Sequence, residues 1–127
     1  MDVPERRLDR REFYQRCASA RLVWSPEGYG WDCFRHYEAA ACGSVPLINY
    51  PSIQRYRPLQ DGTHCLYYAP EPGGLSHAIL GALQDKAKLA AMAENARDHA
   101  NRFHRREIIG RHIVDSCLSS NADPGKP

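Results

Sequence analysis

The chain lacks the usual marks of a secreted, membrane-bound or nucleic-acid-binding protein. Its 127 residues contain no apolar run long enough to cross a bilayer, and residues 1–7 contain no apolar signal region. The net charge at pH 7 is only +2, which is too small to indicate binding to nucleic acid or to an anionic membrane. We therefore expect no nucleic-acid partner and no membrane span.

Paired cysteines and several common catalytic motifs are also missing. The five cysteines are odd in number and scattered, without a Cys-x-x-Cys pair. This pattern disfavours a disulfide framework or a zinc site and indicates reduced thiols, so we expect a cytoplasmic location. The absence of G-x-S-x-G, P-loop and Cys-x5-Arg sequences disfavours lipase-type and phosphatase-type enzymes. No D-x-D pair is present either, so we expect no metal requirement.

Strand and helix patterns alternate through the sequence. The length allows one domain at most, and the hydrophobic fraction of 43% is ordinary for a globular protein. Alternation of this kind predicts an α/β fold with a small parallel sheet and flanking helices, a partial Rossmann-like domain over residues 9–118. We expect residues 1–8 to be frayed and residues 119–127 to be a disordered tail. The predicted helices are 9–20, 32–42, 73–84, 86–102 and 104–118, and the predicted strands are 21–25, 45–49 and 64–68, the last at an edge.

The rest of the chain is organised around residues 25–47. Pro26 ends the first strand, and the glycines that follow it allow the backbone to bend. Asp32 is a good N-cap for the next helix, and Gly43 can adopt the left-handed conformation that ends it. Because a glycine loop that leads into a helix N-terminus presents free amides, this stretch predicts an anion-binding site.

The same stretch resembles a known enzyme family. Residues 38–48, Glu-Ala-Ala-Ala-Cys-Gly-Ser-Val-Pro-Leu-Ile, are similar to the E-A-x-A-x-G-x-P segment of group 1 glycosyltransferases, which have two Rossmann-like domains (GT-B architecture). Residues 25–30 together with Phe34 and Arg35 resemble the exostosin-like and spore-maturation-protein-like branches of that group. The resemblance covers roughly residues 10–115. It departs from the family in one respect, because many members carry an E-x7-E pair whereas ten residues separate Glu27 from Glu38.

This resemblance implies binding of a nucleotide-sugar donor. In the family the region belongs to the C-terminal domain, and the matching glutamate, Glu38, typically holds the ribose. The substrate would be a nucleotide diphosphate sugar, with no further cofactor and with catalytic residues unassigned. The implied donor-binding residues are Glu27, Gly28, Tyr29, Gly30, Arg35 and Glu38.

The helix pattern alone leaves alternatives open for these residues. Glu38 can accept two ribose hydroxyls or form an i,i+3 ion pair with Arg35, and Arg35 can bind a phosphate or pair with Glu38. We expect Phe34, Tyr37 and Ala41 to form the apolar stripe of the helix, and the opposite position of His36 favours a surface histidine over a base.

Other aromatic and basic residues have two interpretations as well. Tyr29 and Trp31 can stack on a nucleobase or pack over the glycine turn. The stretch Arg55-Tyr56-Arg57 can contact a diphosphate, although we expect it to be exposed. The arginines before residue 12 alternate with acids, which favours a solvated helix face over a nucleic-acid arm.

A two-domain glycosyltransferase also needs an acceptor-binding domain and the first strands of the donor domain. We expect both to lie outside this chain, as in an excised half-domain, a naturally short gene, or a subunit completed by a second chain. The alternative function is a truncated, non-enzymatic nucleotide-binding or assembly module with the same fold. Because a three-strand sheet leaves an exposed edge, a homodimer is a further possibility.

Overall fold

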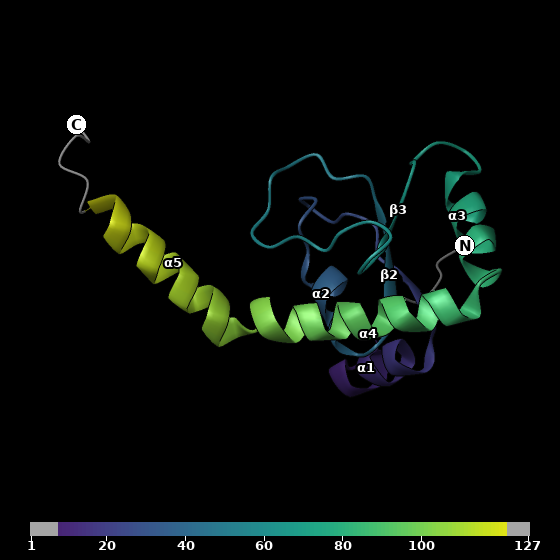
Figure 1. Cartoon of the computed structure of the whole chain (residues 1–127), viewed down its shortest axis with the longest axis horizontal. Helices are drawn as coiled ribbons and strands as arrows, with labels where there is room; N and C mark the ends of the chain where they lie inside the picture. The colour runs from purple at the N-terminus through teal and green to yellow at the C-terminus, as the bar shows by residue number, and fades with distance from the viewer. Residues whose placement is uncertain (1–7, 122–127) are drawn as a thin grey trace, which may run out of the picture.

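Helices and strands alternate through residues 8–121, the part of the chain that the computed structural model describes. The first half holds α1 (Arg10–Ser19), β1 (Leu22–Trp24), α2 (Phe34–Ala41) and β2 (Val45–Asn49). The second half holds β3 (Leu66–Tyr68), α3 (Gly74–Leu83), α4 (Lys86–Phe103) and α5 (Arg106–Asn121). This order of elements, shown in Figure 1, confirms the predicted α/β fold.

The three strands form one parallel sheet in the order β1-β2-β3. Leu22 pairs with Val45 at the start of β1, and Asn49 pairs with Tyr68 at the end of β2. Parallel pairing of β1 and β2 with a helix between them is what the punctuation by Pro26 and Gly43 predicts. The predicted edge position of β3 is confirmed as well. All three strands therefore end at the same side of the sheet, where the loop after β1 also lies.

The central strand, β2, is buried along its whole length, as expected for a parallel strand covered on both faces. Its proline is tolerated because of its position in the ladder. On the side of β2 that faces β1, the amide of Val45 donates to the carbonyl of Arg21, and the carbonyl of Leu47 accepts from the amide of Ser25. The nitrogen of Pro46 thus faces β3, whose pairing begins only at Leu66 with Leu47, so no ladder bond is lost.

Helix α2 ends as predicted and begins differently. Gly43 has a φ of 87°, and the amides of Gly43 and Ser44 bond to the carbonyls of Ala40 and Ala39. These two hydrogen bonds form a Schellman motif, which requires a residue in the left-handed conformation, and glycine adopts it readily. The predicted N-cap is wrong, because Cys33 occupies that position without a side-chain cap bond.

The buried face of α2 is rotated from the predicted one. His36, Ala39 and Ala40 are the buried residues of this helix, whereas Phe34 is 86% exposed. The prediction of a surface His36 and a buried Phe34 is therefore wrong. The physical reason is close packing: α4 lies across α2, and small alanines let the two helices approach.

Helix α4 closes the core. Its residues Ala96 and Ala100 pack with Trp31, Ala40 and Ile48 in one hydrophobic cluster. At its other end Leu89 and Met92 pack with Val45 in a second cluster, which confirms Met92 as a core residue. In Figure 1 α4 crosses the body of the chain beside α2 and β2, while α5 runs away from it.

Helices α1 and α5 are the first and last elements of the described region. Asp9 caps α1 by accepting a hydrogen bond from the amide of Glu12. Helix α5 continues to Asn121, beyond the predicted end at residue 118. Residues 1–7 and 122–127, which include most of the predicted frayed N-terminus and disordered tail, lie outside the described residues.

Between residues 8 and 121, no helix has the length and apolarity needed to span a membrane. All five cysteines lie in this part of the chain as free thiols.

Candidate functional site

The loop between β1 and α2 is held by the last residue of β2. The side-chain oxygen of Asn49 accepts a hydrogen bond from the amide of Glu27 at 2.9 Å. The backbone oxygen of Asn49 accepts a second one from the indole nitrogen of Trp31 at 2.8 Å. Two points of the glycine loop are therefore attached to the carboxyl end of the central strand.

Side chains from the first turn of α2 hold the same loop from its other side. His36 Nδ1 lies 2.7 Å from Ser25 Oγ, and His36 Nε2 lies 2.7 Å from the carbonyl oxygen of Trp31. Arg35 donates through Nε to Ser25 Oγ at 3.3 Å and through Nη2 to the carbonyl of Pro26. Both ends of the loop are thus fixed, and Arg35 contacts the loop instead of pairing with Glu38.

These bonds determine the protonation state of His36. A carbonyl can only accept, so Nε2 carries the proton and Nδ1 accepts from the Ser25 hydroxyl. Burial lowers the pKa of His36, and the charges of Arg35 and Arg55 lower it further, against opposing effects of the Trp31 carbonyl and Asp32. A neutral imidazole with one donor and one acceptor is what the loop geometry needs.

The tip of the loop extends into solvent. Glu27, Gly28, Tyr29 and Gly30 are all exposed, and Tyr29 has 116% relative exposure. Neither Gly28 nor Gly30 has a positive φ, and a Cβ at either position would meet nothing within 4 Å. The fold itself does not require glycine here, so these two positions leave the backbone open to a close neighbour from outside.

Glu38 lies in the second turn of α2, half-buried. Its Oε1 accepts a hydrogen bond from the hydroxyl of Tyr14 on α1 at 3.2 Å. Within residues 8–121 no Lys, Arg or His forms an ion pair with this carboxylate. The predicted alternative, an ion pair between Arg35 and Glu38, is therefore not formed.

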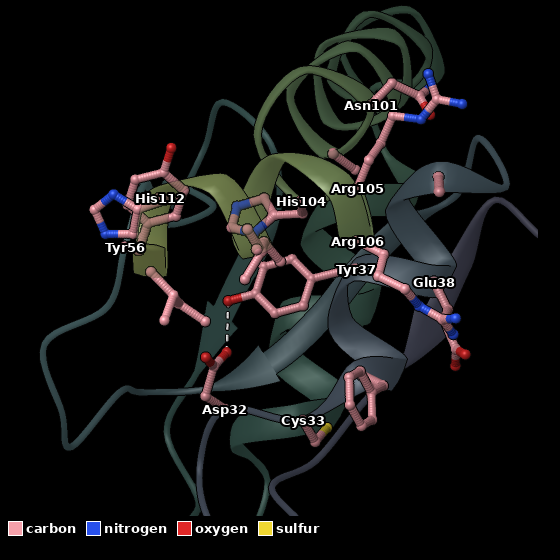
Figure 2. A pocket seen from close by; sticks show the side chains of 16 residues that line it. Asp32, Cys33, Tyr37, Glu38, Tyr56, Asn101, His104, Arg105, Arg106 and His112 are labelled. Atoms are coloured by element: carbon pink, nitrogen blue, oxygen red, sulfur yellow. Dashed lines mark hydrogen bonds between the residues drawn. The ribbon is translucent and has the colours of Figure 1, made fainter. Parts of the chain in front are cut away.

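A large cavity runs along the exposed side of α2, and Glu38 lies on its wall. The cavity has a volume of about 930 Å³ and is bounded by α2, the loop before β3, and the junction of α4 and α5. Figure 2 shows Glu38 and the Tyr56–His112 pair at different ends of this cavity. We call it the α2 cavity; it is lined by Asp32, Cys33, Phe34, Tyr37, Glu38, Ala41, Tyr56, Ala100, Asn101, His104, Arg105, Arg106, Ile109, Gly110, His112 and Ile113.

Two aromatic stacks line the α2 cavity. Tyr37 stacks on His104 with ring centroids 4.1 Å apart, and Tyr56 stacks on His112 at 3.9 Å. Burial raises the pKa of Tyr37, and its hydrogen bond to Asp32, drawn in Figure 2, adds to the rise. Burial lowers the pKa of His104. An apolar cavity with a few polar groups and titrating side chains is the usual form of a small-molecule site.

The structure decides between the two interpretations of Trp31 and corrects the expected position of Arg55. Trp31 is 4% exposed and packs in the core, which favours the packing interpretation over stacking on a base. Arg55, expected to be exposed, is half-buried with its guanidinium carbon 4.3 Å from the Trp31 ring centroid. Arg57 is exposed, as expected.

No metal ligands are assigned. In the part of the chain that the structure describes, no three His, Cys, Asp or Glu side chains lie close enough to hold an ion together.

Comparison with known proteins shows the fold and leaves the family open. No protein-family model matches the chain, and no curated protein matches it. Among solved structures the chain is similar to sucrose-phosphate synthase from Thermosynechococcus elongatus, with a TM-score of 0.68 and 20% sequence identity. The match covers 87% of this chain and 27% of that enzyme. The fold is therefore α/β with a small parallel sheet, consistent with a partial Rossmann-like domain of GT-B architecture. The match supports this glycosyltransferase-like fold and does not support the exostosin-like branch that the resemblance indicated.

Sequence reasoning missed the far wall of the α2 cavity. His104, Arg105, Arg106 and His112 come from the α4–α5 junction, more than sixty positions after α2. Only the row of histidines and arginines between residues 99 and 112 marks this segment in the sequence.

Proposed function

We propose that the chain binds the nucleotide-sugar donor of a glycosyltransferase, with the nucleoside held in the α2 cavity. The residues that we propose to contact the donor are Glu27, Gly28, Tyr29, Gly30 and Glu38, and Arg35 supports them indirectly. The observation that carries the proposal is the state of Glu38, a half-buried carboxylate on the wall of the cavity without an ion-pair partner among residues 8–121. Such a group needs a ligand or solvent to satisfy its remaining lone pairs.

The spacing along α2 supports a nucleotide in this orientation. Phe34 and Glu38 both line the cavity, and a helix rises about 1.5 Å per residue, so roughly 6 Å separates the first turn from Glu38. A phosphate at the first turn would place its ribose near Glu38. Cys33 leaves the start of α2 without a side-chain cap. The amide of His36 donates to the carbonyl of Cys33, and the amides of Phe34 and Arg35 can donate to an anion.

Arg35 has an indirect part in this proposal. Its Nε and Nη2 groups hold Ser25 and Pro26, and together with His36 they fix the loop whose exposed glycines would lie against the donor. Arg35 is then a positioning residue, and the leaving diphosphate would be stabilised by backbone amides and by a cation that is not committed to the loop.

Sugar transfer itself needs more than this chain. The chain spans 27% of the length of sucrose-phosphate synthase, and the acceptor-binding part of the proposed enzyme would come from a further domain or a second chain. Within the described part of the chain β1 pairs only with β2, so the sheet edge at β1 is available for such a partner.

The experiment is calorimetric titration of the purified chain and two variants with a nucleoside and its diphosphate, across the common bases. Glu38→Gln keeps an oxygen that can accept from Tyr14 and removes only the charge. Two charge-assisted bonds to ribose hydroxyls are worth about 1 to 3 kcal/mol more than amide bonds, so affinity should fall about 5-fold to 100-fold for nucleoside and diphosphate alike.

Arg35→Lys is the matched control, because it keeps the charge and loses the planar fork. It should lower the thermal midpoint slightly by weakening the loop contacts and should affect the diphosphate more than the nucleoside. Equal binding by the wild type and Glu38→Gln removes Glu38 from the site. Failure of every nucleoside to bind refutes the proposed function.

A further inference from the structure

Arg55 lies where the loops after β1 and β2 meet. Its guanidinium carbon is 4.3 Å from the Trp31 ring centroid and 5.8 Å from that of Tyr67. Its Nη1 donates to the hydroxyl of Tyr67 at 2.9 Å. Trp31 belongs to the glycine loop and Tyr67 to β3, so this cation spans the carboxyl ends of the sheet.

Among residues 8–121 the charge of Arg55 has no counter-ion. Within residues 8–121 no Asp or Glu carboxylate forms an ion pair with it, and its buried Nε has no hydrogen-bond partner. A guanidinium has five N–H donors, and the described residues accept only one bond from them. Cation–π contact with Trp31 compensates part of the lost hydration, but an unpaired, half-buried cation remains costly.

The positions of the two arginines near the loop differ in one decisive way. Arg35 uses two of its nitrogens to hold Ser25 and Pro26, so its fork is occupied by the protein. Arg55 stacks on Trp31, whose ring centroid is 4.9 Å from that of His36 in the first turn of α2. The positive charge of Arg55 also reaches the imidazole of His36 and the phenol of Tyr37.

We propose that Arg55 is the cation that receives the diphosphate of the ligand, bound between the loop after β1 and the loop after β2. This inference rests on the proposed function, since it specifies which side chain contacts the anionic part of the donor. A diphosphate supplies acceptor oxygens for the terminal N–H groups of Arg55 that no described residue bonds, and a guanidinium can donate to two such oxygens at once.

The test uses inorganic pyrophosphate as the probe, titrated by calorimetry into the full chain in buffer without divalent ions. The same nucleoside and diphosphate pair as above is titrated in parallel. Arg55→Met keeps an aliphatic chain over Trp31 and removes the charge. Arg55→Lys keeps the charge without the fork. Arg11→Met, an exposed arginine on α1, changes the net charge equally at a distance and is the matched control.

Arg55→Met should weaken pyrophosphate and diphosphate binding about 10-fold to 100-fold, and Arg55→Lys several-fold, while nucleoside affinity and the Arg11→Met variant stay at wild-type values. A role in packing alone would lower the thermal midpoint of Arg55→Met without this selective loss, and would overturn the inference. Wild-type pyrophosphate affinity in Arg55→Lys and Arg55→Met, or no pyrophosphate binding by the wild type, would also overturn it. If pyrophosphate binding depends on Arg55 but no nucleoside binds, the anion site at Arg55 is supported and the proposed function is refuted.

Discussion

Acidification should destabilise the chain through His36, because the folded structure has no place for an imidazolium there. His36 is 1% exposed, and its Nδ1 accepts from Ser25 while its Nε2 donates to Trp31. A second proton on Nδ1 would turn the acceptor into a donor that faces a hydroxyl which already accepts from Arg35. Protonation thus reverses the bond to Ser25, whose hydroxyl must then accept from both His36 and Arg35 and turn its own proton elsewhere, and adds a buried charge beside Arg35 and Arg55.

The direction and the size of this pH effect on stability follow from the lowered pKa of His36, and burial is the main cause of that lowering. The stabilisation is complete above 6.5, the ordinary histidine value, and is lost as pH falls through the lower folded pKa. Between the two values one histidine contributes about 1.4 kcal/mol per pH unit. Burial also lowers the pKa values of His64 and His104, so both act in the same direction. Against a total stability of about 5 to 15 kcal/mol, this slope is large.

The assay is urea unfolding followed by circular dichroism at half-unit steps from pH 8 to pH 5. The free energy of unfolding should be flat above pH 7 and should fall below pH 6.5. His36→Gln cannot titrate, so its curve should be shallower by up to about 1.4 kcal/mol per pH unit, even though the variant is less stable throughout. Parallel curves for the wild type and His36→Gln would refute the reasoning.

Three further predictions concern the backbone, the surface and the ligand. Gly43→Ala should lower the free energy of unfolding by about 1 kcal/mol in urea titrations, because alanine at a φ of 87° is strained although nothing lies within 4 Å of the new Cβ; an unchanged midpoint would contradict the Schellman assignment. Phe34→Ala should change the free energy of unfolding by less than about 0.5 kcal/mol, since this ring is 86% exposed; a loss above about 2 kcal/mol would show that Phe34 packs in the core. A nucleoside diphosphate should bind the chain alone with a Kd on the order of millimolar to high micromolar, because a cleft open on one side is poorly pre-organised; submicromolar calorimetric affinity would contradict this.

The sequence predicted the order of the elements because local signals punctuate it. Pro26 and Gly43 act through their own backbone geometry, and Asp9 caps α1 through an amide three residues away. Such signals do not depend on the rest of the fold. The parallel sheet followed from the alternation of strand and helix.

Long-range contacts explain what the sequence could not predict. His36 faces inward because Ser25 and Trp31 supply partners for both ring nitrogens. Phe34 faces outward because α2 packs on α4 through its opposite face, where Ala40 meets Ala96 and Ala100. The role of Arg55 likewise depends on Trp31 and Tyr67, which meet only in the folded chain. Rules of helical periodicity weight large apolar residues and cannot register such partners.

The placement of Glu38 at a ribose is the central claim, and titration of Glu38→Gln with a nucleoside that lacks phosphates tests it most directly. A ligand without phosphates makes no contact that depends on Arg35, Arg55 or the N-terminus of α2. The hydrogen bond from Tyr14 is kept in the variant, because the amide oxygen of glutamine can accept it. The account predicts an affinity loss of about 5-fold to 100-fold at unchanged thermal midpoint, and a smaller loss with the 2′,3′-dideoxynucleoside. Identical affinities of the wild type and Glu38→Gln for the nucleoside would contradict it.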